Sequence, residues 1–370
     1  MMRHKSAYLD WYTSLRKLKY DFRSSGIAYF KYNLNFDDVD LSANYAYGNP
    51  EAVKLLSQRY RVQPENVFVS SEGASGQNAR IIRLLAERSA EKCEAIVEYP
   101  TYEPLLRLVQ EYFPHVKRLV RDEQNAFKVD AAFLQKIASR KTALLVLTNP
   151  HAPSSAVLDN GELKGVMKVA REYGFYVLCD EIYAEFDREA IPTIFCVDEE
   201  FGITTTSLTK VYGLGGLKLG IALANEKIVK ELYVDTVNTV GNAANMVQMI
   251  AVKLLKEGRE ALETHKKRWN PIKSEAEKWL MEKGFNYFPN NVGVTYWVKL
   301  PIKDTYNWTN KHTIPKYSLA TVPGTFFLFR NGYELVKSDW IRLGLGNIYP
   351  EEHEIKEALK ILEKAINIYK

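Results

Sequence analysis

Lys210 is a residue whose type and setting suit covalent chemistry. It ends the segment SLTK at 207–210, which follows a Thr-rich apolar run at 203–206. A partly desolvated lysine has a lowered pKa, and its neutral amine forms Schiff bases with carbonyl compounds. An ordinary solvated lysine is the alternative. The glycine-rich run at 213–216 fails the GxGxxG pattern because Lys218 stands where the third glycine is needed, so a dinucleotide site is disfavoured.

Asp180 is a second residue with functional potential, because it comes directly after the apolar run FYVLC at 175–179. A carboxylate at the end of a buried strand is costly unless it is paired. Its partner is either a structural ion-pair residue or a cationic group of a ligand. Tyr183, three residues later, is placed to reach the same pocket with its phenol.

Two further positions suit anion binding. The small residues at 71–76 (SEGASG) precede a helical pattern, and backbone N–H groups at a helix N-terminus attract phosphate. A plain glycine-rich turn is the alternative, and no Walker A sequence follows. Arg342 lies in the apolar segment at 339–344 (DWIRLG), where it needs an anionic partner. That partner is either an internal carboxylate or a substrate carboxylate held by a bidentate contact.

The elements that position these residues follow a repeated pattern of strand and helix. Helical patterns at 76–90 and 160–174 lie between apolar runs. Unbroken apolar runs are typical of strands buried on both faces of a parallel sheet. The sequence therefore predicts an α/β sheet with helices on both sides. The predicted strands are 67–70, 95–99, 143–147, 175–179, 203–207 and 219–224.

The pattern changes after about residue 243. Long helices over 244–284 precede strands at 296–300 and 340–345, with a loop around Pro323 and Gly324 between those strands and a last helix at 351–369. Strands and helices in this order predict a smaller α+β domain. We therefore divide the chain into an N-terminal arm that packs with the small domain, a large domain and a small domain, at 1–44, 45–260 and 261–370.

Together and in this order, the motifs resemble the fold-type I enzymes that depend on pyridoxal 5'-phosphate (PLP), specifically the class I/II aminotransferases. The resemblance covers roughly residues 45–350. It implies the PLP-dependent transferase fold, with a mostly parallel central sheet in the large domain and a smaller α+β domain built from both chain ends. It also implies an enzyme that moves an amino group between an amino acid and a 2-oxo acid through an internal aldimine on Lys210.

The resemblance assigns a role to each matching residue. Lys210 would carry the cofactor and then move a proton between the substrate Cα and the cofactor carbon C4'. Asp180 would keep the pyridine nitrogen protonated, which makes the ring a better electron sink. Tyr183 would bond the ring's phenolic oxygen, and Arg342 would bind the substrate α-carboxylate. The other implied cofactor contacts are the backbone N–H groups of Ala74 and Ser75, the hydroxyl of Ser207, the stacked ring of Tyr102, and Tyr47 reaching the phosphate of a neighbouring subunit. The role of Tyr47 implies a homodimer with shared active sites.

Two positions depart from the family pattern. Ala152, in NPHAPSS at 149–155, stands where most members carry an asparagine that bonds the phenolic oxygen of the cofactor. Lys218 stands where most members carry an arginine that grips the phosphate, and lysine keeps the charge but loses the planar fork. We expect these residues to hold the cofactor less firmly than usual.

Composition argues against several other classes of protein. The net charge of +5 is small for 370 residues, and no basic run predicts a nucleic-acid tail. Three scattered cysteines and six histidines without ligand spacing predict neither a disulfide framework nor a metal site. The charged N-terminus resembles no signal peptide, and no apolar stretch approaches the length of a membrane span. We therefore expect a cytoplasmic enzyme without nucleic-acid or membrane partners.

Alternatives remain open at this point. A β-lyase or a decarboxylase uses the same fold and cofactor, because the reaction depends on which Cα bond is aligned with the π system. A non-catalytic PLP-binding regulator is a second alternative, although residues 1–44 hold no recognisable helix-turn-helix. In dicarboxylate-specific members of the family that the chain resembles, a second arginine from the other subunit receives the distal carboxylate. The stretch at 237–242 (VNTVGN), where we would look for it, has no arginine, which disfavours aspartate and glutamate as amino donors.

Overall fold

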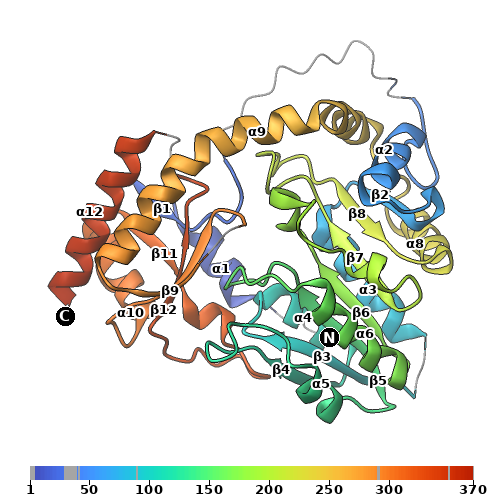
Figure 1. Cartoon of the computed structure of the whole chain (residues 1–370), viewed down its shortest axis with the longest axis horizontal. Coiled ribbons are helices and arrows are strands. Elements are labelled where there is room, and N and C mark those ends of the chain that lie inside the picture. Colours follow the sequence, from blue (N-terminus) through green and yellow to red (C-terminus); the bar gives the residue numbers. More distant parts are fainter. Residues whose placement is uncertain are drawn as a thin grey trace.

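The fold consists of two sheets that lie side by side, with one long helix running across both (Figure 1). The computed structural model describes residues 5–28, 40, 42–88, 91–289, 292–348 and 351–369. The larger sheet has seven strands in the order β2-β8-β7-β6-β5-β3-β4. These are β2 (Val67–Ser70), β3 (Glu94–Tyr99), β4 (His115–Val120), β5 (Thr142–Thr148), β6 (Tyr176–Asp180), β7 (Gly202–Thr206) and β8 (Gly220–Leu223).

Both faces of the larger sheet are covered, which explains why the interior positions of β5 and β6 are apolar. Along β5, Leu144 and Val146 join one buried cluster and Leu145 and Leu147 join another. The first cluster contains side chains of α3 (Gly73–Glu87), α4 (Glu103–Tyr112) and α8 (Glu226–Thr239). The second contains side chains of α5 (Ala131–Ile137), α6 (Asn160–Tyr173) and α7 (Ile194–Val197). Alternate residues therefore face opposite helical layers.

The smaller sheet is formed by strands from both ends of the chain. Its order is β1-β11-β12-β10-β9, and β1 pairs in parallel with β11 while the other neighbours are antiparallel. The strands are β1 (Tyr20–Phe22), β9 (Asn286–Phe288), β10 (Thr295–Lys299), β11 (Leu319–Pro323) and β12 (Trp340–Gly344). The remaining helices are α1 (Ala7–Ser14), α2 (Pro50–Tyr60), α9 (Asn245–Glu282), α10 (Thr305–Trp308), α11 (Ile314–Tyr317) and α12 (Glu352–Tyr369).

The α/β class and the mostly parallel sheet are confirmed, but several elements differ from the prediction. Strand β8 is antiparallel to both of its neighbours, so the sheet is mixed. The strand β4 was missed because it is an edge strand, with the polar sequence HVKRLV. Strand β11 was missed because its last residue, Pro323, belongs to a Pro-Gly pair that is typical of a loop. The predicted domain boundary at 260/261 falls inside α9, which continues from the larger sheet to the smaller one (Figure 1). Within the described part of the chain, no helix combines the length and apolar character that crossing a membrane requires.

Helix α1 is fixed to the large domain by the carboxylate of Glu103. The backbone N–H groups of Ala7 and Tyr8 donate to Glu103 Oε1 and Oε2 at 3.1 and 2.7 Å, and Ser6 Oγ donates to Oε2 at 2.9 Å. Arg107 Nε donates to Oε1 at 2.9 Å, so the buried carboxylate also has a counterion. One side chain at the start of α4 therefore satisfies the free N–H groups of another helix.

We expect Glu103→Gln to lower the free energy of unfolding by about 3 kcal/mol, because it leaves Arg107 without its buried counterion and turns an amide N–H₂ toward other donors. Chemical unfolding monitored by circular dichroism measures the change in the free energy of unfolding. Asp10→Asn is the matched control, since it removes an exposed charge from α1 itself and should cost no more than about 1 kcal/mol. Equal effects of the two substitutions would contradict the role given to Glu103.

Candidate active site

A cavity of about 290 Å³ lies beyond the carboxyl ends of the parallel strands. Strand β6 ends at Asp180 and β5 at Thr148, both of which line the cavity, and Lys210 lies just after β7. Ligand sites of open α/β sheets occur at this edge. The lining residues are Tyr8, Ser25, Glu72, Gly73, Ala74, Ser75, Tyr102, Thr148, Ala152, Asp180, Ile182, Tyr183, Thr209, Lys210, Gly215 and Lys218.

Asp180 is a buried carboxylate held by neutral groups. Asn78 Nδ2 donates to its Oδ2 at 2.7 Å, and the backbone N–H of Ile182 donates to its Oδ1 at 3.1 Å. Thr205 Oγ1 in turn donates to Asn78 Oδ1 at 2.5 Å, which fixes the orientation of the amide. Burial raises the pKa of Asp180, while these hydrogen bonds and the charge of Lys210 act in the opposite direction. Among the described residues, no cation forms a salt bridge with Asp180, so the carboxylate has room for a cationic ligand group.

Lys210 is packed beneath the N-terminal arm. The backbone N–H of Ile27 donates to the Lys210 carbonyl at 2.8 Å, and a Cβ at Gly26 would lie only 2.6 Å from Lys210 Cδ. Burial lowers the pKa of the Lys210 amine. The Tyr8 phenol and Asp180 oppose this shift, while the charges of Arg342 and Lys218 reinforce it. A lysine in this setting supplies the neutral amine that nucleophilic attack on an aldehyde requires.

The start of α3 forms the anion-binding wall of the cavity. Gly73, Ala74 and Ser75 form its first turn, and its N-cap residue Glu72 makes no side-chain capping bond. Lys218 lies opposite in the left-handed region at φ 57°, and its carbonyl accepts from the Gly73 N–H at 2.6 Å. Unsatisfied N–H groups and a nearby ammonium group together suit a phosphate.

Tyr102, Tyr183 and Ala152 also line the cavity, and their roles toward a cofactor remain predictions. The Tyr183 hydroxyl donates to Ser25 Oγ of the arm at 2.7 Å. Ala152 brings no side-chain donor, and its backbone N–H donates to Thr148 Oγ1 at 2.8 Å. The arm therefore supplies a hydroxyl next to the phenol that the family resemblance assigns to the ring oxygen.

Three of the residues assigned from the sequence do not line this cavity. The Ser207 hydroxyl donates to the Leu219 carbonyl at 2.5 Å, and Thr209 faces the cavity in its place. Arg342 is buried behind the lining, where its Nη2 donates to the Tyr8 hydroxyl and the Arg23 carbonyl, both at 3.0 Å. Tyr47 is partly exposed, and its ring packs against Tyr233 with 4.6 Å between centroids. The roles given to these three residues remain predictions.

Sequence reasoning missed the residues that reach the cavity from outside the strand ends. Tyr8 and Ser25 come from the N-terminal arm, where no motif marks them. Asn78 lies one helical turn into α3. It is four residues after Ala74, and residues i and i+4 share a helix face, so this spacing could have indicated that Asn78 points the same way as Ala74. Thr148 follows the predicted strand at 143–147 directly, and this place at a strand end was the available signal.

Comparison with known proteins shows to which protein family this chain belongs. Residues 41–362 match the model of aminotransferase class I and II, so the chain belongs to this family of PLP-dependent transaminases. Aspartate aminotransferase of Pyrococcus horikoshii is 25% identical over 341 residues, which cover 86% of this chain and 81% of the relative. Histidinol-phosphate aminotransferase of Thermoanaerobacter pseudethanolicus is 30% identical over 244 residues, 64% of each chain.

Solved structures show the same fold across the whole chain. A PLP-dependent aminotransferase from Streptococcus suis has a TM-score of 0.87 at 23% identity and covers 100% of this chain and 99% of its own. The PLP-dependent cyclase OrfR has a TM-score of 0.84 at 17% identity, with the same coverage of both chains. Proteins named for different reactions therefore share this fold, so the residues of the cavity must indicate the reaction.

The residues present fit the family's cofactor. The buried carboxylate of Asp180, which has no ion-pair partner among the residues that the structure describes, suits a protonated pyridine nitrogen. The first turn of α3 suits the phosphate, and Lys210 suits the aldehyde carbon. Bound PLP supplies an electron sink for the charge that develops at the substrate Cα. With the cofactor in place, Lys210 would take the Cα proton on its Nζ and release it again, and Asp180 would hold the charge of the ring nitrogen.

Replacing Lys218 should change the titration of Lys210. Because the ammonium charge of Lys218 lowers the pKa of Lys210, Lys218→Gln should raise that pKa and move the pH profile of Lys210 labelling in the apoprotein to higher pH. Mass spectrometry of reductive methylation across pH measures the shift. Lys230→Gln removes an exposed lysine of α8 and should leave the profile in place. A profile that stays fixed or moves to lower pH in Lys218→Gln would contradict the electrostatic account.

Proposed function

We propose that this aminotransferase uses amino donors without a distal carboxylate and that Arg342 receives their α-carboxylate. The observation that carries the proposal is the pairing of Arg342. Its guanidinium is buried yet bonds only a phenol and a backbone carbonyl, and its Nε has no hydrogen-bond partner among the described residues. A buried guanidinium that lacks a carboxylate partner favours an anionic ligand.

The few cationic groups at the cavity support the proposal that the amino donor has no distal carboxylate. The lysines that line it are Lys210 and Lys218, and no arginine of the described residues does so. Arg80, which does not line the cavity, is paired with the lining residue Glu72 at 2.5 Å and with Asp235 at 2.5 Å. A second substrate carboxylate would therefore lack a cationic partner among the described residues that line the cavity. Relatives named for aspartate and for histidinol phosphate both exist, so relatedness alone leaves the donor open.

A panel of amino donors tests the proposal. Neutral or aromatic amino acids should convert the bound cofactor to its pyridoxamine form with release of a 2-oxo acid, and aspartate should do so at least tenfold more slowly.

Arg342→Lys should raise KM for the donor more than it lowers kcat, because the bidentate contact is lost. Lys210→Ala should bind cofactor without turnover. Release of ammonia or carbon dioxide in place of pyridoxamine formation would favour a lyase or a decarboxylase and contradict transamination.

We further propose that the active enzyme is a homodimer in which Tyr47 contributes to the neighbouring site. Exposed apolar side chains gather at Tyr47, along α8 and around the start of α9, namely Val234, Val237, Val240 and Met246. Exposed apolar residues that cluster in this way suit a self-complementary contact between two copies.

The double substitution Val237→Glu and Val240→Glu should produce a monomer in sedimentation velocity and weaken cofactor retention. Val120→Glu is the matched control, because Val120 is 43% exposed on the edge strand β4 at the opposite end of the sheet. An unchanged sedimentation coefficient in the double variant, or an equal effect of Val120→Glu, would place the contact elsewhere.

A further inference from the structure

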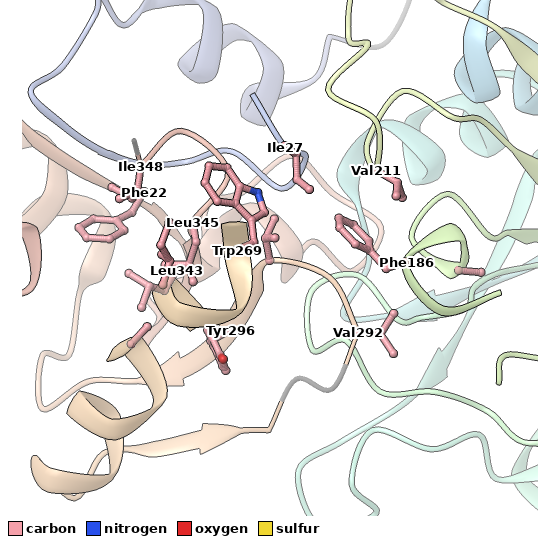
Figure 2. Close-up of a cluster of buried hydrophobic side chains, with 14 of the residues drawn as sticks. Phe22, Ile27, Phe186, Val211, Trp269, Val292, Tyr296, Leu343, Leu345 and Ile348 are labelled. Carbon is pink, nitrogen blue, oxygen red and sulfur yellow. The ribbon is translucent and has the colours of Figure 1, made fainter. Parts of the chain in front are cut away.

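A second cavity, of about 230 Å³, lies where the arm, the large domain and α9 meet. Ile27 comes from the arm, Phe186 and Asp187 from the 3₁₀ helix η2 (Ala184–Asp187), and six residues from the middle of α9. None of its lining residues lines the active-site cavity. Figure 2 shows Ile27, Phe186 and Trp269 beside one another at this junction, with Phe186 on the ribbon of the large domain. We call it the junction cavity, lined by Ile27, Phe186, Asp187, Leu262, His265, Lys266, Trp269, Asn270, Lys273, Gly293 and Val294.

One side of the junction cavity is apolar. Ile27, Phe186 and Trp269 belong to a single buried cluster, and Leu262 packs against it. The indole Nε1 of Trp269 is buried and has no hydrogen-bond partner among the described residues. An unpaired buried donor is costly in a folded protein and is commonly satisfied by a ligand or a bound water.

The polar side of the junction cavity carries a positive charge. Lys266 and Lys273 line it, against the single carboxylate of Asp187. Lys266 pairs with Glu263 at 3.2 Å on the surface, whereas the Nζ of Lys273 has no ion pair or hydrogen bond within the described residues. Burial lowers the pKa of Lys273, and the charge of Glu277 acts against this. Burial also lowers the pKa of His265 to about 4, so the imidazole is neutral at pH 7.

We propose that the junction cavity is a second ligand site, which binds a small aliphatic carboxylate with its anionic end at Lys273 and its hydrocarbon chain against Trp269, Ile27 and Phe186. The volume is roughly seven or eight times that of a water molecule in the liquid, which limits the ligand to the size of an amino acid or a short-chain acid. The apolar wall distinguishes such an acid from inorganic phosphate, which would leave that surface unused.

The position of the junction cavity couples this ligand to the active site. The N–H of Ile27 donates to the carbonyl of Lys210, and the Ser25 hydroxyl, two residues earlier, accepts from Tyr183. On the other wall, Phe186 follows Tyr183 by three residues within the same short helical segment. A ligand held between Ile27 and Phe186 therefore restrains both segments that meet over Lys210, and should protect the Ile27 amide from exchange.

Valerate (pentanoate) is a suitable probe, and Arg342→Gln holoenzyme is a suitable background because it removes the carboxylate partner proposed for the active site. Valerate should change the tryptophan fluorescence of this variant in a saturable way and slow hydrogen exchange in the peptide that contains Ile27. Adding Lys273→Gln should raise the half-saturating concentration about tenfold or more, the loss expected for a hydrogen bond to a charged group. Adding Trp269→Phe should abolish the fluorescence response.

Lys278→Gln is the matched control, since Lys278 lies on the same helix with its side chain 67% exposed and should leave valerate binding unchanged. Inorganic phosphate should give no saturable response. If Arg342→Gln does not fold, Arg342→Met replaces it as the background, because it also removes the positive charge. The proposal is overturned if valerate gives no saturable response, if Lys273→Gln and Lys278→Gln behave alike, or if phosphate binds as well as valerate. None of these outcomes depends on turnover, so failure here is separate from failure of the proposed donor specificity.

Discussion

The active site is organised by a carboxylate and an amine that are both withdrawn from water in one cavity. Asp180 is buried with only neutral hydrogen-bond donors, and Lys210 is desolvated beneath the arm. Neither charge is compensated by a salt bridge among the described residues, although each influences the pKa of the other. Burying charge in this way is costly, so the structure is suited to a ligand that supplies the missing cationic group and consumes the amine. The family's cofactor has both features.

The rest of the architecture positions and orients Asp180 and Lys210. Strands β6 and β7 place Asp180 and Lys210 at one sheet edge, and the Thr205–Asn78 pair orients the carboxylate from α3. The arm contacts Lys210 through Gly26 and Ile27 and reaches Tyr183 through Ser25, while β1 anchors the arm to the smaller sheet. Because Ile27 lines the junction cavity and its N–H donates to the Lys210 carbonyl, a change at the junction cavity would have a short structural route to Lys210.

The sequence predicted the site residues at strand ends because an apolar run precedes each of them. An Asp or Lys that follows an unbroken apolar run is conspicuous, and so Asp180 and Lys210 were found together with the first turn of α3. Tyr8 and Ser25 were not found, because they lie more than 150 residues away from Tyr183 or Lys210 in the chain and no local pattern fixes where the arm packs. Strands β1, β4 and β9 were missed for a related reason. Short or edge strands are held by their neighbours in space and carry weak periodicity of their own.

The central claim is that Asp180 is reserved for a cationic ring nitrogen, and the protonation state of that nitrogen tests it most directly. The measurement is the ¹⁵N chemical shift of ring-labelled cofactor bound to the wild-type enzyme and to Asp180→Asn at the same pH. The account predicts a protonated nitrogen in the wild type and an unprotonated one in the variant, because an amide cannot stabilise the charge. An unprotonated nitrogen in the wild type, or the same protonated state in both proteins, would contradict it.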